Sequence, residues 1–278
     1  MSNTQSKKSP LYVTLLSDFG TEDGYVGAMK GVLLKGLPDL QVLDVSHSIK
    51  AFGIKQAAFS LMNYAFYFPP GTVHMVVVDP GVGTRREGLV VQSSEYFFIG
   101  PNNGVFSYIY QSTKYQAYRI REKQFGKKVS PTFHGRDIFA PAAVRLLKGD
   151  VVSDFCDPFQ KLVSFYESYE DLGDDEYRLK VIHVDHFGNL ILNFTMKDWE
   201  SLGSPQDVRI QINHSFLVGI MKTFGDVPVD QLLMTWDSRG FLQIAQNCGN
   251  AAQSLSKKEG DHIQLKIFHL SHPKRTDI

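Results

Sequence analysis

The first half of the chain alternates short apolar runs with segments whose apolar residues recur at helical spacing. The runs at residues 11–16, 42–45 and 73–78 are rich in β-branched side chains and too short for helices, so they predict strands. Residues 24–34 and 54–67 carry apolar side chains three and four positions apart, which is typical of amphipathic helices. Strands alternating with helices in this order predict βαβ units and a mostly parallel sheet.

Further along this half, the pattern changes to shorter elements. Residues 89–92 and 96–99 are typical of a pair of strands, and residues 105–110 predict a short helix. Residues 138–148 carry apolar side chains at helical spacing, with Asp137 just before them. An acid in that place is a favourable N-cap, so we expect Asp137 to cap this helix.

The second half lacks long helical patterns and consists of short alternating strands. An acidic, polar stretch separates the halves and is interpreted as a linker. The predicted strands then cover residues 177–185, 190–194, 208–212, 216–219, 232–236, 241–245 and 262–268. We therefore expect a disordered start (1–10), an α/β domain (11–168), the linker (169–176) and an all-β, barrel-like domain (177–278).

Composition and charge exclude several classes of protein. The 278 residues hold 29 Lys plus Arg and 29 Asp plus Glu, so the net charge is zero. This balance argues against a nucleic-acid or anionic-membrane partner held by bulk attraction. No apolar run approaches the roughly 18 residues of a membrane span, and residues 1–10 lack the apolar core of a signal peptide. With only 2 cysteines, Cys156 and Cys248, a cytoplasmic location is expected.

Candidate chemistry gathers where predicted strands end. Asp79 follows the run 73–78 directly and begins a tight Pro-Gly loop, with Arg85 and Arg86 just beyond it. Asp18 occupies the same place after the first strand, and His134 lies just ahead of a helix N-terminus. Ligands of open α/β sheets bind at the carboxyl ends of the strands. The alternative is a solvated turn in which Asp79 is only a turn acid.

A metal hydrolase is a second interpretation of these residues. His47, Asp79, His134 and Asp137 have the right side chains for zinc or iron, but no HxH, HExxH or cysteine pair fixes two ligands locally. We therefore expect no metal. The sequence also lacks GxGxxG, GxxxxGK[ST] and GxSxG motifs, so dinucleotide binding, nucleoside triphosphate binding and a nucleophilic serine elbow have no local signature.

Two further polar clusters lie in the second half, VDHFGN at 184–189 and WDSRGF at 236–241. Each alone is ordinary hairpin chemistry, because Asp, Ser and Gly favour tight turns. A hairpin explanation is less satisfactory when five polar clusters in one chain all occupy strand ends.

Six segments in order resemble one known family: SDFGTEDGYVGAMKG, VVVDPGVGTRR, GPNNG, TFHGRDIFAPAA, DHFGN and DSRG. The chain is similar over about residues 11–270 to the S-adenosylmethionine hydroxide adenosyltransferases, which are also called adenosine-forming S-adenosylmethionine hydrolases. These enzymes are related to halogenases that attack the same substrate with fluoride or chloride. The resemblance implies an α/β domain followed by a β-barrel domain, and a homotrimer with sites between chains. It implies no cofactor.

The resemblance also assigns roles to particular residues. It implies that Asp79, Arg86 and His134 handle water. The implied substrate contacts are ribose for Asp18, the nucleoside for Phe52 and Phe224, the methionine amine and carboxylate for Asp185 and Ser238 with Arg239 beside them, and adenine for Asn189. Two features depart from relatives: Arg85 precedes Arg86, and DHFGN is one residue shorter than the halogenase DHPFGN.

The chemistry of S-adenosylmethionine accounts for such residues. Its sulfonium lets methionine leave as a neutral thioether, so the reaction needs a nucleophile and no general acid. An arginine and a histidine beside a water stabilise its hydroxide form, and a carboxylate orients them. We therefore expect hydrolysis to adenosine and L-methionine. The alternatives are 5′-halogenation of the same substrate and a sensor that binds S-adenosylmethionine or a nucleoside without turnover.

Overall fold

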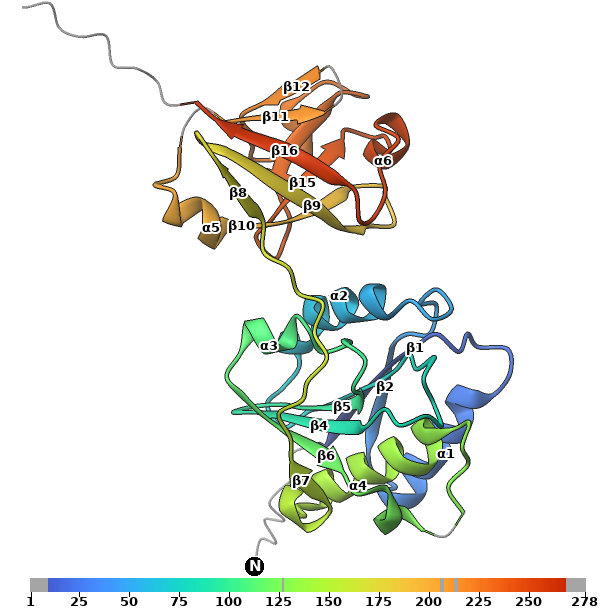
Figure 1. The fold of residues 1–278 in the computed structure, drawn as a ribbon. Helices are drawn as coiled ribbons and strands as arrows, with labels where there is room; N and C mark the ends of the chain where they lie inside the picture. Colours follow the sequence, from blue (N-terminus) through green and yellow to red (C-terminus); the bar gives the residue numbers. More distant parts are fainter. Residues whose placement is uncertain (1–9, 127, 206–207, 213–214, 269–278) are drawn as a thin grey trace, which may run out of the picture. The chain divides into compact units, whose positions relative to one another are not determined.

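The structure is a computed structural model that describes residues 10–126, 128–205, 208–212 and 215–268 (Figure 1). It divides into two compact units, Met1–Tyr166 and Glu167–Ile278. The disordered start expected at residues 1–10 falls almost wholly outside the described residues. Within the described ranges, no helix combines the length and apolar character needed to cross a membrane.

A seven-stranded sheet forms the centre of the first unit (Figure 1). Its strands lie in the order β2-β1-β3-β5-β4-β6-β7. Their bounds are β1 Tyr12–Ser17, β2 Gln41–Ser46, β3 Val73–Val77, β4 Gly88–Ser93, β5 Phe97–Pro101, β6 Tyr115–Ile120 and β7 Cys156–Pro158.

The sheet is mixed, whereas the sequence favoured a mostly parallel one. Strand β1 runs parallel to β2 and β3, and β3 runs parallel to β5. The pairs β4–β5, β4–β6 and β6–β7 are antiparallel. The change occurs at β4 and β5 because a short turn joins them, and a short turn can only connect antiparallel strands.

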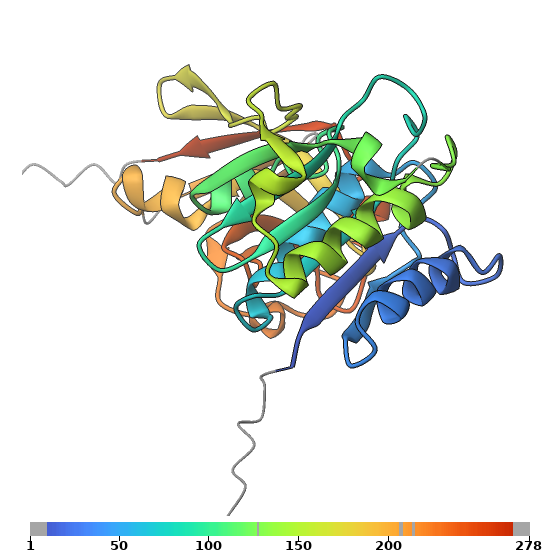
Figure 2. The same cartoon turned by 90° about the horizontal axis from the view of Figure 1, so that it is seen from below.

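Helices cover both faces of this sheet. Alternate residues of each strand point to opposite faces, so Leu15 packs in the cluster with α1 and α4 while Leu16 packs in the cluster with α2 and α3 (Figures 1 and 2). The helical segments are α1 Tyr25–Gly36, α2 Ile54–Tyr64, η1 Ala65–Tyr67, α3 Ile109–Ser112, η2 Glu122–Phe125, η3 Gly135–Phe139, α4 Ala140–Lys148 and η4 Val152–Asp154.

The start of α4 differs from the expected capped helix. Asp137 lies inside η3, a π-helical turn, and α4 has no side-chain cap. The Asp137 carboxylate instead accepts hydrogen bonds from the Ser130 backbone N–H at 2.8 Å and from the Arg136 side chain at 2.7 and 2.9 Å. The prediction of an N-cap was wrong: the helical turn begins at Gly135, so Asp137 lies within it and not ahead of it.

The second unit contains a sheet that curls toward a barrel, as β12 comes close to β14. Its path is β12-β11-β16-β9-β10-β15-β14-β13, with β8 beside β9. The elements are β8 Glu170–Gly173, β9 Glu176–Val184, β10 Leu190–Thr195, α5 Met196–Ser201, β11 Val208–Ile212, β12 Ser215–Val218, β13 Ile220–Met221, η5 Phe224–Asp226, β14 Leu232–Trp236, β15 Phe241–Gln246, α6 Ala251–Ser254 and β16 His262–Ile267.

The stretch expected as a linker, residues 169–176, is largely part of this second unit. Residues 170–173 form β8, which pairs antiparallel with β9 through Glu170 opposite Arg178. An ion pair between the same two side chains accompanies the pairing. The acidic composition that indicated a linker therefore belongs to an edge strand, where exposed charges are common.

A histidine is buried on the face of the first sheet that α2 covers. His74 in β3 is fully buried, and its Nδ1 lies 2.8 Å from the Thr14 hydroxyl. Aromatic rings surround it, those of Tyr64, Phe68 and Phe98 among them. Burial disfavours the charged imidazole and lowers the pKa of His74 from 6.5 to about 3.

This burial makes stability depend on pH in a definite direction. Between pH 6.5 and 3 the unfolded chain takes a proton at residue 74 and the folded chain does not, so acid lowers the free energy of unfolding. Between pH 6.5 and 4.5 this one group should cost roughly 2–3 kcal/mol. Denaturant unfolding at both pH values should show a smaller acid loss in His74→Gln than in the wild type. The exposed His186→Gln is the control, and an equal acid loss in His74→Gln would contradict the prediction.

Candidate functional site

Three side chains from separate loops meet beside the carboxyl end of β3. Asp79 follows β3 almost directly, Arg86 lies just before β4, and His134 lies just before η3. Arg86 Nε donates to Asp79 Oδ1 at 2.9 Å, and Arg86 Nη2 donates to Asp79 Oδ2. The same Nη2 lies 2.8 Å from His134 Nδ1. The guanidinium thus joins the carboxylate and the imidazole.

Two charged groups of this cluster are deeply buried. The Arg86 side chain is 9% exposed and the Asp79 side chain 6%. A buried ion pair keeps both charges only when its hydrogen bonds are well formed, and the bidentate contact provides them. The remaining nitrogen, Arg86 Nη1, is buried and has no hydrogen-bond partner within the described residues. The positive charge of Arg86 is therefore only partly satisfied by hydrogen bonds within the described residues.

The protonation state of His134 follows from its neighbour. A guanidinium can only donate hydrogen bonds, so Nδ1 must accept, and the proton of the neutral ring is on Nε2. Burial lowers the pKa of His134 below its usual value, and the positive charge of Arg86 acts in the same direction. Glu122, Asp79 and Asp137 oppose this shift but do not reverse it. The imidazole is consequently neutral at neutral pH.

Only one of the two adjacent arginines belongs to the cluster. Arg86 makes the contacts described above, whereas Arg85 is exposed. The family resemblance assigned the role to Arg86, and Arg85 was noted as a departure from relatives. In the structure, Arg86 is the arginine that contacts Asp79 and His134.

Close backbone approach holds the loops together. Gly83 has φ of 75°, and a Cβ there would lie 2.3 Å from the Pro131 carbonyl oxygen. A side chain at this position would push the Asp79 loop away from the segment that carries His134. Asn103, from the GPNNG segment, donates to the Val78 carbonyl at 2.9 Å and fixes the strand end next to Asp79.

A cavity of about 330 Å³ adjoins the cluster. Asp18 lies at its edge, and Asp18 Oδ2 accepts a hydrogen bond from the Phe52 backbone N–H at 2.8 Å. Phe52 is 69% exposed and has φ of 65°, so this loop is held in a backbone shape that non-glycine residues rarely adopt. The lining residues are Asp18, Phe19, Tyr25, Ala51, Phe52, Val77, Asp79, Val82, Thr132, Phe133, His134 and Gly135.

Three aromatic side chains on the cavity wall were not singled out from the sequence. Phe19, Tyr25 and Phe133 contact one another with ring centroids 5.4 to 5.7 Å apart. They give the pocket a largely apolar wall, and Asp18, Asp79 and His134 supply polar side chains. Their positions were accessible in principle, since Phe19 directly follows Asp18 and Phe133 directly precedes His134.

Of the four residues considered for a metal hydrolase, only Asp79 and His134 lie together, joined by Arg86. His47 bonds Ser17 through Nδ1 at 2.7 Å and Asp44 through Nε2 at 3.0 Å, while Asp137 pairs with Arg136. Each of these side chains is thus engaged away from Asp79. In the described parts of the chain, no group of three or more His, Cys, Asp or Glu side chains is arranged to hold a metal ion.

In the second unit, Asp185 and Asn189 form one turn between β9 and β10. Asp185 Oδ1 accepts from the backbone N–H groups of Phe187 and Asn189, and Oδ2 accepts from the Asn189 side chain at 2.8 Å. Gly188 packs against the Asn250 side chain, and its carbonyl accepts from the Ala252 N–H at 2.9 Å. This turn therefore rests against the start of α6.

Ser238 and Arg239 lie in another turn, between β14 and β15. Asp237 shapes it by accepting from the Arg239 and Phe241 backbone N–H groups at 2.8 Å each. In the β10–β15 ladder, Leu190 pairs with Ile244 and Thr195 pairs with Phe241. The two turns therefore lie at opposite ends of this ladder, and the second unit does not bring Asp185 together with Ser238 and Arg239.

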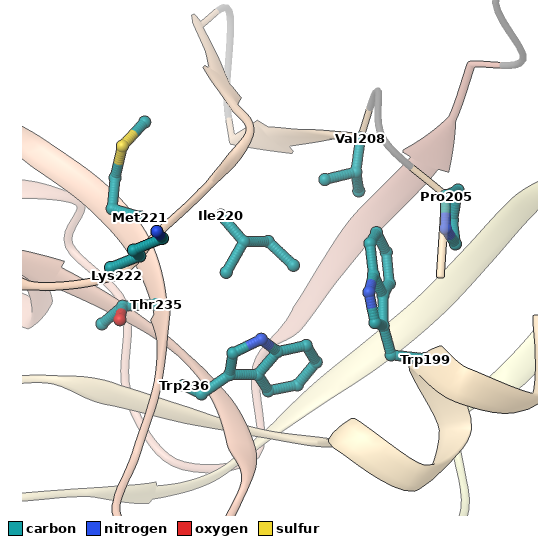
Figure 3. Close-up of a pocket in the computed structure, with 8 residues that line it drawn as sticks. All are labelled: Trp199, Pro205, Val208, Ile220, Met221, Lys222, Thr235 and Trp236. Atoms are coloured by element: carbon teal, nitrogen blue, oxygen red, sulfur yellow. The ribbon is translucent and has the colours of Figure 1, made fainter. Parts of the chain in front are cut away.

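Phe224 begins η5 and is 44% exposed. A separate pocket of about 300 Å³ lies in the second unit, with Trp199 and Trp236 in its wall and their ring centroids 6.2 Å apart (Figure 3). Trp236 ends β14, next to the turn that holds Ser238. Trp236, the first residue of the WDSRGF segment, lines this pocket, but Asp185, Asn189, Phe224, Ser238 and Arg239 do not.

The charge of Arg86 should be measurable in the titration of His134. Arg86→Met removes a positive neighbour, so the pKa of His134 should rise. The matched control is Arg85→Met, which removes the same charge from the neighbouring residue, whose side chain is exposed. NMR titration of labelled histidine in both variants checks this, with circular dichroism to confirm folding. A His134 pKa that is unchanged or lower in Arg86→Met would show that Arg86 does not govern the imidazole.

Comparison with known proteins adds independent information to this geometry. Family models described as the SAM hydroxide adenosyltransferase N-terminal and C-terminal domains match residues 13–156 and 179–264. The (R)-S-adenosyl-L-methionine hydrolase of Methanocaldococcus jannaschii is 33% identical over 265 residues, covering 91% of this chain and 95% of that protein. A fluorinase of Nocardia brasiliensis is more distant, at 24% identity over 95% of this chain and 99% of its own length.

A solved structure described as an uncharacterized conserved protein from Thermotoga maritima has a TM-score of 0.81 and 32% sequence identity. The match covers 91% of this chain and 99% of that one. The ordered motifs, the two sheet-rich units and both family models agree, and the chain belongs to the SAM hydroxide adenosyltransferase family.

Proposed function

We propose that this protein hydrolyses S-adenosyl-L-methionine to adenosine and L-methionine. The observation that carries the proposal is the Arg86 guanidinium, which is buried and joins Asp79 to His134, two residues that line a cavity of about 330 Å³. The small number of cysteines supports a cytoplasmic setting.

The reaction needs little more than an oriented and stabilised nucleophile. The water oxygen bonds to C5′, the C5′–S bond breaks with its electron pair going to sulfur, and one proton is released. Arg86 and the Nε2–H of His134 stabilise the developing hydroxide, and Asp79 holds Arg86 in place. Positive sulfonium and hydroxide neutralise each other in the transition state, so a largely apolar cavity favours attack. No group in this scheme has to protonate the leaving thioether.

The cavity residues supply the nucleoside contacts in this proposal. The Asp18 carboxylate accepts hydrogen bonds from the ribose hydroxyls, since its Oδ1 is not used by the Phe52 N–H. Phe52 at the rim and the aromatic wall opposite it cover the sugar and base.

For the second-unit residues we propose the substrate contacts that the family resemblance implies. Ser238 and Arg239 take the methionine amine and carboxylate, and Asn189 and Phe224 contact the adenine side. The expected contact of Asp185 with methionine remains a prediction, since the carboxylate is already engaged with three donors of its own turn. Its direct contribution is to orient Asn189.

Product analysis in ¹⁸O-water tests the reaction. Purified protein incubated with S-adenosyl-L-methionine should release methionine and adenosine with the label in the 5′-hydroxyl. A 5′-halo-5′-deoxyadenosine as the main product at high chloride or bromide would establish the halogenase alternative. Binding by calorimetry with the substrate intact after a day would establish the sensor alternative. Either result contradicts hydrolysis.

The same assay separates chemistry from binding. Asp79→Asn and His134→Ala should lower kcat by about 100-fold or more with little change in KM, because they act on the developing hydroxide. Asp18→Ala should instead raise KM about tenfold, since one hydrogen-bonded group is worth roughly 1–1.5 kcal/mol in both ground and transition states. Parallel losses of affinity and turnover in Asp79→Asn would recast it as a substrate-holding residue.

We further propose a homotrimer in which residues of the first unit of one chain and the second unit of its neighbour meet on one substrate. This is a heterologous contact closed by rotation. The proposal is supported by the polar residues of both units. Those of the first unit suit the ribose and the attacking water, and those of the second suit the methionine and adenine parts of the same substrate.

Complementation of two inactive variants tests this arrangement. One variant is Asp79→Ala and the other carries Ser238→Ala with Arg239→Ala. After co-expression, random mixing should give about a quarter of the sites two intact halves if sites lie between chains. Activity that stays at the level of the parents would show that each site belongs to a single chain. The parents refolded separately and then mixed serve as the control.

A further inference from the structure

A hydrogen-bonded chain of side chains lies next to the proposed ribose site but outside the Asp79 cluster. It starts at Ser17, the last residue of β1, whose hydroxyl is 2.7 Å from His47 Nδ1. His47 Nε2 is 3.0 Å from Asp44 Oδ1, and Asp44 Oδ2 accepts from Lys30 Nζ at 2.5 Å. Ser17 is 0% and His47 6% exposed. The chain runs from the end of β1 through β2 to α1 (Figure 1).

Each hydrogen bond along this chain can be assigned a donor and an acceptor without conflict. Partial burial acts to raise the pKa of Asp44, but hydrogen bonds from His47 and Lys30 outweigh it and lower that pKa below its ordinary value. The carboxylate therefore accepts from both neighbours, which places a proton on His47 Nε2. In the neutral ring Nδ1 then accepts from the Ser17 hydroxyl, whose oxygen accepts from the Phe19 N–H at 3.4 Å.

The combination of Ser, His and Asp is not a nucleophilic triad in this place. Ser17 has no exposed surface and does not line the cavity, so no substrate atom can reach its hydroxyl. An activated serine must present its oxygen to a reacting carbon. A fully buried hydroxyl can act only on the structure around it.

What surrounds this hydroxyl is the loop that carries Asp18. The Gly20 N–H donates to the His47 carbonyl at 2.9 Å, and the Phe52 N–H donates to Asp18 Oδ2 at 2.8 Å. The loops after β1 and after β2 are thus joined at three points, and the bond between Ser17 and His47 is the buried one. Strand β2 is at the edge of the sheet, so it has a neighbouring strand on one side only. The three bonds to the loop after β1 therefore help to hold the loop after β2 in place.

We propose that Ser17, His47 and Asp44 form a positioning clamp that sets Asp18 and Phe52 for the ribose of the substrate. The inference rests on the proposed function for the identity of the ligand, but the clamp itself is a property of the free protein. His47 is the central member, because its side chain and its backbone carbonyl each hold the Asp18 loop. Its loss should weaken substrate binding and leave the chemistry at Asp79 intact.

Four variants separate this role from general stabilisation. Ser17→Ala removes the buried bond. His47→Gln places its amide near the position of Nε2 and keeps the partner of Asp44, whereas His47→Asn places its amide near Nδ1 and keeps the partner of Ser17. The matched control is Ser46→Ala, since the Ser46 hydroxyl accepts a hydrogen bond from the Ser48 N–H in its own turn, at 3.1 Å.

Ser17→Ala and His47→Gln should raise KM and the calorimetric Kd for S-adenosyl-L-methionine about tenfold, with kcat within about twofold of wild type. His47→Asn should stay closer to the wild type, and Ser46→Ala should match it. Wild-type affinity in Ser17→Ala, or equal losses in Ser46→Ala, would overturn the clamp. Melting temperatures of all four variants show whether a loss of affinity merely follows a loss of stability.

A readout without substrate distinguishes failure of the clamp from failure of the proposed function. Amide hydrogen exchange of Gly20 and Phe52 in the free protein should be faster in Ser17→Ala and unchanged in Ser46→Ala. If the wild type makes no adenosine, the proposed function fails while faster exchange still supports the clamp. Unchanged exchange at both amides in Ser17→Ala refutes the clamp whatever the wild type does.

Discussion

The candidate site of the first unit depends on the bidentate contact between Arg86 and Asp79. Burying either charge alone would cost several kcal/mol, so the two side chains can enter the protein only together and only in good geometry. That geometry depends on backbone features far apart in the chain. Gly83 lets the Asp79 loop approach Pro131, and Asn103 fixes the strand end before Asp79. The pair then determines the tautomer of His134, because a guanidinium leaves the imidazole nitrogen only an acceptor role.

Local pattern was sufficient where one physical cause dominates. The apolar β-branched run before Asp79 has no alternative to a buried strand, and the abrupt Pro-Gly loop after it places the acid at a strand end. The choice between Arg85 and Arg86 was different, since both follow the same loop. In the structure only Arg86 contacts Asp79 and His134, while Arg85 is exposed, and a single sequence does not show which of two adjacent side chains points inward. In the aromatic wall, Phe19 and Phe133 adjoin candidate residues in the sequence, but only the tertiary fold shows that their rings and that of Tyr25 contact one another.

Other differences arise where tertiary pairing overrides composition. The composition of the polar stretch around Glu170 indicated a linker, yet the stretch forms β8 and pairs with β9. An edge strand can keep all its side chains in solvent, so a polar composition does not exclude a strand there. The turns at Asp185 and Ser238 looked equivalent as polar strand ends. Strand pairing places them at opposite ends of one ladder, which no count of polar clusters predicts. Antiparallel partners bring the start of one strand beside the end of the other, so similar turns become distant in space.

The π-helical turn before α4 has a consequence for how this protein can vary in length. A π turn holds one residue more than the α-helical turn it replaces, and here that residue lies between His134 and α4. Removing one residue from Gly135–Phe139 would restore α-helical hydrogen bonding, but it would also rotate the start of the helix by about 100° relative to α4. His134 would then move away from the Arg86 guanidinium, and the buried residues of the segment, Gly135, Ile138 and Phe139, would be displaced as well. In this segment a deletion thus alters the site and the core around it together, so chain length here is constrained by both.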